Sequence, residues 1–229
     1  MSASDKDYPK SEQGKPVALE QRGEETDGRR YSPSVARNRD PILQVFRDHV
    51  AQTGNVLEIA SGTGEHGAYL TSNLADLRWT YSDIDADSRR SQQAWAAAAG
   101  HGRLDGPFVV DASQSDWGDA ERPDHWDVVA SVNMIHIAPF EAALGLISGA
   151  GRLLKPGGKL FLYGPFARNA EIAPSNAAFN ESLQSRDPTW GVRDLDQQIV
   201  PMAEEVGLSV TNIIEMPANN LSVVLQRQA

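Results

Sequence analysis

A glycine-containing segment, residues 58–67, carries the residue types and spacing that most clearly indicate chemistry. Gly62, Gly64 and Gly67 have the G-x-G-x-x-G spacing between a predicted strand and a predicted helix. Asp83 follows Gly62 by 21 residues. Glycines in such a turn let a ligand approach the backbone, and a carboxylate at that distance accepts hydrogen bonds from ribose hydroxyls. The pattern predicts a nucleotide-type binding site; the alternative is a turn with a purely structural role.

Two carboxylates flank these glycines and indicate the charge of the ligand. Glu58 ends the predicted strand and Glu65 begins the predicted helix. They would repel a pyrophosphate at the helix N-terminus and attract a cation. S-adenosylmethionine carries an ammonium and a sulfonium group, so we expect it to be the cofactor, with Asp83 binding its ribose and Asp111-Ala112 contacting its adenine. Each acid alone is also compatible with a helix N-cap.

The remaining expected cofactor contacts lie in the same loops or near the start of the first helix. Arg37 is expected to pair with the carboxylate at the methionine end of the cofactor, and a surface ion pair is its alternative. The other residues expected to contact the cofactor are Ala60, Gly62, Gly64, His66, Ile84 and Asn133.

With S-adenosylmethionine as the cofactor, the expected reaction is the transfer of its methyl group to an acceptor. This acceptor should lie at the loops that follow the predicted strands 126–132 and 159–163. Methyl transfer is an in-line displacement, so the protein must align the acceptor and exclude water. His136 is the candidate general base, because an unperturbed imidazole has a pKa of about 6.5. Tyr163 is the second catalytic candidate, and ordinary packing is the alternative for both residues. The residues expected to bind the substrate are Tyr31, Asn38, Trp190 and Arg193.

An alternation of strands and helices must position these residues. Predicted helices cover about 40–51, 65–74, 86–100 and 139–154, and predicted strands cover 55–60, 78–83, 107–111, 126–132 and 159–163. Short connections between such elements indicate βαβ units and a parallel sheet. Ligands of parallel sheets bind at the carboxyl ends of the strands, where the expected site residues lie.

The C-terminal part of the chain departs from that alternation. Residues 209–215 and 221–225 are rich in β-branched residues, and the five residues between them are too few for a crossover helix. These strands must therefore pair antiparallel. The predicted fold is α/β and Rossmann-like, with a seven-stranded, mostly parallel sheet and an antiparallel terminal strand.

Several segments together resemble class I S-adenosylmethionine-dependent methyltransferases. They are residues 58–64, 82–83, 127–136 and 154–158. More narrowly, the chain is similar to the methyltransferase-like protein 26 family, a domain of unknown function, over residues 31–42, 133–137, 163–166, 175–176, 190–194 and 216–221. The resemblance implies the fold and the cofactor, and little about the acceptor. Ala60 departs from the broad class, which has its first glycine at that position.

Composition excludes several classes of protein. The 229 residues carry a net charge of −10, and no cluster of basic residues exceeds an adjacent pair, so nucleic acid and anionic membranes are not expected partners. The chain has no cysteine, which excludes disulfides and thiolate metal sites. Histidines and acids show no metal-ligand spacing. No apolar run is long enough to span a bilayer, and the N-terminus does not resemble a signal peptide.

The chain divides into two parts of different composition. Residues 1–30 are polar and charged, so we expect a disordered tail, with a lid over the ligand as the alternative. Residues 31–229 form the predicted methyltransferase domain. A cytoplasmic monomer or homodimer acting on a small molecule is the default expectation.

Two other functions fit parts of the pattern. A nicotinamide-dependent oxidoreductase would share the glycine spacing, but it would leave Glu58 and Glu65 unexplained. A non-catalytic scaffold that binds the cofactor is the third hypothesis, and Ala60 is the residue that favours it.

Overall fold

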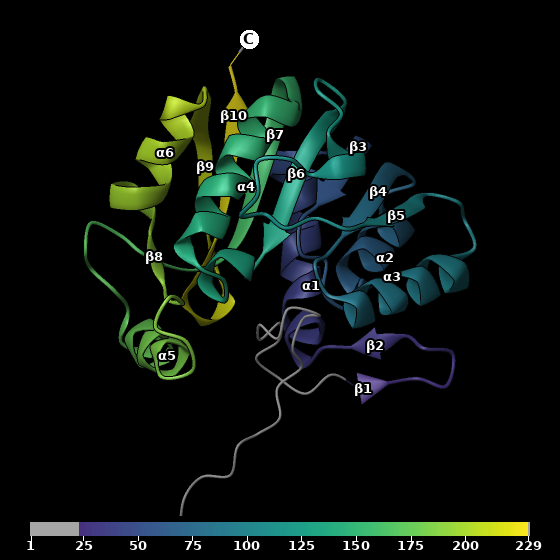
Figure 1. Ribbon diagram of the computed structural model, residues 1–229, viewed down its shortest axis with the longest axis horizontal. Coiled ribbons are helices and arrows are strands. Elements are labelled where there is room, and N and C mark those ends of the chain that lie inside the picture. Colours follow the sequence, from purple (N-terminus) through teal and green to yellow (C-terminus); the bar gives the residue numbers. More distant parts are fainter. Residues whose placement is uncertain (1–22, 229) are drawn as a thin grey trace, which may run out of the picture.

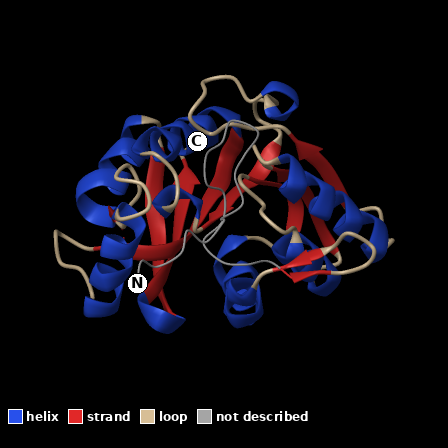
Figure 2. Ribbon diagram, turned by 60° about the horizontal axis from the view of Figure 1, so that its bottom comes forward, coloured by secondary structure: helices blue, strands red, loops and turns tan. Residues whose placement is uncertain are grey.

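The computed structural model describes residues 23–228 and shows a twisted sheet with helices on both faces (Figures 1 and 2). Seven strands lie in the order β5-β4-β3-β6-β7-β10-β9, and the short strand β8 pairs with β7 beside this path. The seven-stranded sheet predicted from the sequence is confirmed. The strands are β3 (Thr53–Glu58), β4 (Asp76–Ser82), β5 (Leu104–Phe108), β6 (Trp126–Val132), β7 (Leu154–Ala167), β8 (Arg193–Asp194), β9 (Leu208–Met216) and β10 (Asn220–Arg227).

The strand directions also agree with the prediction. Strands β5, β4, β3, β6 and β7 are mutually parallel. Strand β10 enters antiparallel between β7 and β9, with Val224 opposite Phe161 and Val223 opposite Ile213. The short connection through residues 217–219 forces this reversal, because a parallel crossover requires a dozen or more residues.

Alternating side chains of the central strands fill two separate cores. Val56, Val128 and Phe161 belong to one core, and their neighbours Leu57 and Val129 belong to the other. All five are fully buried, as expected for a parallel sheet covered on both faces. The helices are α1 (Pro33–Val45), α2 (Glu65–Asn73), α3 (Ala86–Ala99), α4 (Phe140–Leu153), α5 (Pro174–Gln184) and α6 (Val200–Glu205).

Helix α1 begins at Pro33, well before the start near residue 40 that the sequence predicts. Ser32 is extended, with φ −117° and ψ 128°, and Pro33 occupies the start of the helix, where its missing N–H leaves no bond unmade. Pro41 lies inside the helix instead of at its start. A proline there removes one backbone hydrogen bond, while the buried neighbours Ile42 and Leu43 hold the helix against the sheet.

Residues 23–30, predicted to belong to a disordered tail, include a small two-stranded ribbon. Strand β1 (Gly23–Glu24) pairs antiparallel with β2 (Arg30–Tyr31). The backbone N–H of Arg30 donates to Ser91 Oγ at 2.9 Å, and the Tyr31 ring contacts the edge of Trp95. These contacts with α3 order a polar segment that has no apolar pattern of its own. The rest of the predicted tail, residues 1–22, lies outside the described residues.

Smaller differences concern the edges of the sheet. Strand β5 spans 104–108 rather than the predicted 107–111. Strand β7 begins at Leu154, before the predicted 159–163, and residues 155–158 bulge from it, because Trp126 pairs with Leu154 and Val128 pairs with Lys159. Helix α3 ends at the C-cap Gly100, with φ 63°, which agrees with the predicted end of this helix. Within residues 23–228, no helix combines the length and apolarity that crossing a bilayer requires.

Helix α4 packs closely against the loop after β5 at Gly145, and a substitution there tests this contact. A Cβ at this position would collide with the backbone oxygen of Ala112. We expect Gly145→Ala to lower the free energy of unfolding by about 1–3 kcal/mol, measured by urea denaturation. Leu144→Ala is the control, because Leu144 is 46% exposed on the same helix and its truncation should change stability little. Equal stability of the two variants would contradict this packing.

Candidate functional site

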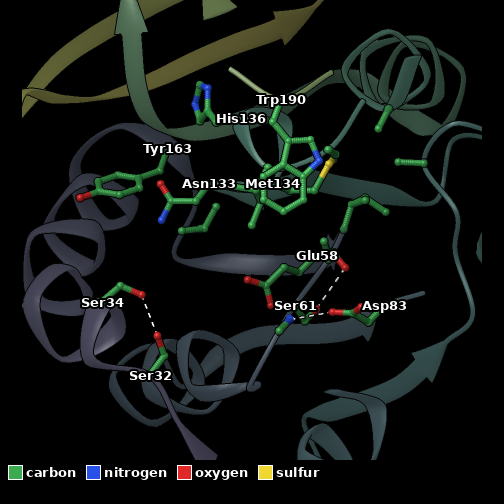
Figure 3. Close-up of a pocket in the computed structure, with 18 of the residues that line it drawn as sticks. Ser32, Ser34, Glu58, Ser61, Asp83, Asn133, Met134, His136, Tyr163 and Trp190 are labelled. Carbon is green, nitrogen blue, oxygen red and sulfur yellow. Dashed lines mark hydrogen bonds between the residues drawn. The ribbon is translucent and has the colours of Figure 1, made fainter. Parts of the chain in front are cut away.

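A cavity of about 790 Å³ opens at the carboxyl ends of the central strands. Its size falls in the usual range for small-molecule sites, about 300–1,000 Å³. Loops after β3, β4, β5 and β6 form one part of its wall. Further parts come from α1, α4, β7, α5 with the segment after it, and the β9–β10 turn. Figure 3 shows Glu58 and Asp83 on one side of the cavity and Asn133 and Trp190 on the other.

The loop after β3 is held in an unusual backbone conformation. Ala60, Gly62 and Gly64 all have positive φ, at 59°, 57° and 89°. Ser61 locks the loop, since its N–H donates to the carbonyl of Ser82 at 2.8 Å and its hydroxyl donates to the carbonyl of Glu58 at 3.2 Å. Glycine adopts positive φ without cost, whereas alanine is strained there. The loop therefore keeps its open shape even at the position where the sequence departs from glycine.

Glu58 is a buried carboxyl group at the floor of the cavity. Its side chain is 1% exposed, and Oε2 accepts a hydrogen bond from Trp79 Nε1 at 2.9 Å. Within the described residues it forms no ion pair. Burial raises the pKa of Glu58 to about 8, and the nearby charge of Asp83 acts in the same direction. A cationic ligand at this position would stabilise the ionised form.

Two further acids follow the neighbouring strands: Asp83 comes directly after β4, and Asp111 lies in the loop after β5. Asp83 Oδ2 accepts from the N–H of Gly62 at 2.8 Å, and Oδ1 accepts from the N–H of Asp85 at 2.9 Å. Asp111 Oδ1 accepts from the N–H of Ser113 at 2.9 Å. Asp85 caps α3, since its side chain accepts from the N–H of Ser88. Asp83 and Asp111 both line the cavity, together with Ile84, Val110 and Ala112.

Glu65 has a different role from the one that its position suggested. Its Oε2 accepts from the N–H of Ser32 at 2.6 Å and from the hydroxyl of Thr63 at 3.1 Å. The side chain is buried and does not line the cavity. Glu65 therefore fixes the segment before α1 to the glycine loop, and Glu58 is the acid of this pair that faces the cavity.

Three of the expected site residues lie behind the wall of the cavity. Gly64 begins α2 and packs on α3, where a Cβ would lie 3.1 Å from Gln92. Tyr31 packs on Trp95. The guanidinium of Arg193 donates to the carbonyls of three residues, Ile135, Ala138 and Thr189, at 2.8–2.9 Å. Their placement corrects the expectation of direct ligand contact.

His136 lines the cavity, but its imidazole is enclosed by protein. The side chain is 1% exposed, and neither ring nitrogen has a hydrogen-bond partner among the described residues. The ring packs edge-on against Phe166, and a Cβ on Gly164 would collide with Nε2. Burial lowers the pKa of His136 to about 3, and the charge of Arg193 contributes in the same direction. The imidazole is therefore neutral at physiological pH.

The wall nearest α1 combines amide, imidazole and phenol groups. Asn38 Oδ1 lies 2.9 Å from His66 Nε2, and both side chains are buried. Burial lowers the pKa of His66 to about 4 and raises the pKa of the Tyr163 phenol. Arg37 lies at the exposed end of this wall. All four residues line the cavity.

Asn133 and Trp190 also line the cavity, and Asn133 lies beside Tyr163 (Figure 3). Asn133 has a left-handed backbone, with φ 63°, and its N–H donates to the carbonyl of Tyr163 at 2.8 Å. Trp190 is 3% exposed. The backbone hydrogen bond from Gly191 to the carbonyl of His136 joins the segment that carries Trp190 to the loop after β6.

Helix α5 and the β9–β10 turn contribute lining residues that sequence reasoning missed. Asn176 Nδ2 donates to the carbonyl of Asn219 at 2.9 Å, which holds the helix against the turn. Pro174 at the start of α5 could have indicated the helix, but no pattern indicated that it covers the cavity. The lining residues not predicted in these parts include Phe179, Ser182, Arg186, Asp187, Thr189, Pro217, Ala218 and Asn220.

Comparison with known families decides the classification. The family described as "Protein of unknown function (DUF938)" matches residues 29–227. The chain belongs to the DUF938 family. The match spans nearly all of the described residues, so the fold and the cavity both lie inside the family's domain.

Solved structures show which fold the DUF938 chain shares. An O-methyltransferase family protein from Burkholderia thailandensis is 19% identical, with a TM-score of 0.71, over 86% of this chain and 58% of that chain. SibL, an S-adenosylmethionine-dependent methyltransferase, is 18% identical, with a TM-score of 0.67, over 86% and 56%. An O-methyltransferase family 2 protein from Planctomyces limnophilus is 19% identical, with a TM-score of 0.64, over 76% and 50%.

These likenesses establish the fold. The DUF938 chain has the Rossmann-like fold of S-adenosylmethionine-dependent methyltransferases, including the antiparallel terminal strands. It spans between half and three fifths of the length of these three proteins. At such low identity the acceptors of those enzymes cannot be carried over.

The strained backbone at Ala60 leads to a stability prediction. We expect Ala60→Gly to raise the free energy of unfolding of the DUF938 protein by about 0.5–1 kcal/mol, because glycine accepts φ 59° without strain. Ala97→Gly, at an exposed position inside α3, is the matched control and should lower stability by about 1 kcal/mol. Chemical denaturation measures both, and a change of the same sign in the two variants would contradict strain at Ala60.

The buried Glu58 leads to a prediction about pH. Its pKa is raised, so between about pH 4.5 and about pH 8 the folded protein holds a proton that the unfolded chain has lost. The contribution of Glu58 to stability is therefore present at low pH and is lost as the pH rises through this window. The stability difference between the wild type and Glu58→Gln should fall from pH 5 to pH 8 and level off above it, as measured by urea denaturation. Parallel curves for the two proteins would contradict the raised pKa.

Proposed function

We propose that this protein is an S-adenosylmethionine-dependent methyltransferase that methylates oxygen or nitrogen of a small molecule. The observation that carries the proposal is Glu58, a buried carboxyl group with no cationic partner among the described residues, facing a cavity of this fold. A ligand ammonium would supply the missing positive charge. The acids Asp83 and Asp111 on the next two strand ends suit the polar edges of a nucleoside.

The residues present fit the cofactor along the whole row of strand ends. In the proposal, Glu58 binds the ammonium group and Asp83 binds the ribose hydroxyls. Ile84, Asp111 and Ala112 surround the adenine. The positive-φ backbone of the glycine loop leaves room beside these groups, which supports close contact of a ligand with the main chain. Arg37, His66, Ala60, Gly62 and Asn133 complete the proposed cofactor contacts, as all of them line the cavity.

The other half of the cavity is proposed to hold the acceptor. When bound, the cofactor supplies a methyl group activated by a sulfonium. The chain's own residues then have to align the acceptor and keep out water. Asn38, Trp190 and Tyr163 are placed for this task, since their side chains are buried and line the cavity. His136 lines the same region as a neutral imidazole.

The proposal also covers the organisation of the protein. A domain beginning near residue 31, the similarity to the methyltransferase-like protein 26 family, and a cytoplasmic monomer or homodimer belong to it. The net charge of −10 supports the absence of nucleic-acid and membrane partners.

Calorimetric titration with S-adenosylhomocysteine tests the proposal directly. We expect saturable binding, and we expect Asp83→Ala to weaken it by about 1–3 kcal/mol because the ribose loses its acceptor. Asp76→Ala is the control, since Asp76 is exposed at the opposite end of the same strand and should leave affinity unchanged. Absence of both binding heat and thermal stabilisation at millimolar ligand would refute the proposal, and bound NADH detected by fluorescence would favour an oxidoreductase instead.

A further inference from the structure

We propose that the acceptor is a flat aromatic molecule whose nucleophilic atom carries no proton at neutral pH, either a ring nitrogen or a thiolate, and that none of the cavity-lining residues among 23–228 acts as a general base. This inference rests on the proposed methyl transfer. It narrows the proposed oxygen and nitrogen acceptors to a ring nitrogen and adds thiolate sulfur as a further acceptor. It follows from the apolar wall of the acceptor half and from the positions of the titratable groups around it.

The acceptor half of the cavity has a flat, apolar wall. Trp190 and Met134 are 3% and 7% exposed and line it, as does the ring of Phe179 from α5. Figure 3 shows Trp190 across the cavity from Glu58, the expected position of the ammonium group. Aromatic side chains stack favourably on other flat rings. An aromatic acceptor would thus lie between this wall and the activated methyl group.

His136, the histidine on this wall, is enclosed by neighbouring protein atoms and does not face the acceptor half of the cavity with a ring nitrogen. Gly164 and Phe166 lie against the His136 ring, and both ring nitrogens are shielded from contact. In Figure 3 the imidazole lies beyond Asn133 and Trp190, on the side away from Glu58. A base must lie within hydrogen-bond reach of the proton it removes. Burial also lowers the pKa of His136 to about 3, which makes it a weak base.

Each of the other titratable groups that line the cavity among residues 23–228 has another contact or lies in the half proposed for the cofactor. Asp187 Oδ1 accepts from the N–H and the hydroxyl of Thr189, at 2.8 Å and 2.6 Å, which fixes one oxygen of this carboxylate. Burial raises the pKa of the Tyr163 phenol, so the phenol can donate a hydrogen bond but does not act as a phenolate base. His66 contacts Asn38. Glu58, Asp83 and Asp111 lie on the strand ends proposed for the cofactor, and Arg37 and Arg186 are cationic.

Polar groups that are uncharged remain to orient the acceptor. The amides of Asn38, Asn133 and Asn220 and the phenol of Tyr163 line the cavity. Such groups can donate to or accept from a ring substituent without changing its protonation state. They suit a neutral heteroaromatic ring or a delocalised thiolate better than a hydroxyl that must be ionised.

The step balances without a proton acceptor from the protein. The acceptor's lone pair forms a new bond to the methyl carbon while the bond from that carbon to the sulfonium sulfur breaks, and the electrons of the broken bond stay on sulfur. A ring nitrogen then carries the positive charge, and a thiolate becomes a neutral thioether. No proton leaves the acceptor in either case.

Three acceptors of one shape test the inference: isoquinoline, 2-naphthalenethiol and 2-naphthol. After S-adenosylhomocysteine binding has been established by calorimetry, the full chain is assayed with S-adenosylmethionine and each acceptor at pH 7. We expect isoquinoline or the thiol to be methylated about 100-fold faster than the naphthol, the factor that a missing general base costs. The naphthol rate should rise with pH in proportion to its own ionised fraction. The rate with isoquinoline tests a ring nitrogen as the acceptor, and the rate with 2-naphthalenethiol tests a thiolate.

Two variants test whether His136 and Asp187 only line the cavity or act as a general base. His136→Gln and Asp187→Asn should change the rates for all three acceptors by a common factor and leave the shape of each pH profile unaltered. Fast methylation of the naphthol at pH 7, lost selectively in either variant, would overturn the inference and identify the base. If none of the three acceptors is methylated, the proposal of a flat aromatic acceptor is overturned. If the cofactor does not bind, the proposed function itself is refuted.

Discussion

The site depends on a carboxyl group buried without a compensating cation among the described residues. Glu58 is held by an indole hydrogen bond from Trp79 and by burial at the end of a central strand. Burying an ionised carboxylate alone is costly, so the ligand-free protein keeps it protonated at neutral pH. The glycine loop beside Glu58 leaves this carboxyl group facing the cavity, where a ligand could change its protonation state. An ammonium group entering the cavity would release the proton and form an ion pair in a poorly hydrated place, which couples binding to pH.

Three residues with left-handed backbone lie around the same cavity. Ala60, Asn133 and Ala218 all have φ near 60° and all line it, one in each of three loops from different parts of the chain. Left-handed conformations of such residues persist only where the surroundings hold them. Here the loop after β3 is bonded to Ser82, the loop after β6 to the end of β7, and the β9–β10 turn to α5 through Asn176. The left-handed conformations of these three loops therefore lower the stability of the fold, and the hydrogen bonds around the cavity compensate for this cost.

The sequence was sufficient for the parts of this protein that depend on local pattern and chain direction. Strand ends in a parallel sheet meet at one edge, so Glu58, Asp83 and Asp111 could be placed together before any coordinates were known. The orientation and burial of single side chains could not be predicted, because they depend on contacts distant in sequence. Arg193 illustrates this: its type and neighbours suggested a ligand contact, while its three backbone acceptors place it behind the wall. Helix α5 was missed for the same reason.

The buried polar contacts behind the cavity suit the proposed methyl transfer, which would need little acid–base chemistry from the protein. Arg193 fixes the loop after β6, and Glu65 fixes the segment before α1. Neither side chain lines the cavity, yet each holds a segment that does. A displacement at an already activated carbon gains most from alignment, which such rigid walls provide. A proton transfer would instead need a basic group with access to solvent or substrate, and His136 is packed so that it lacks both.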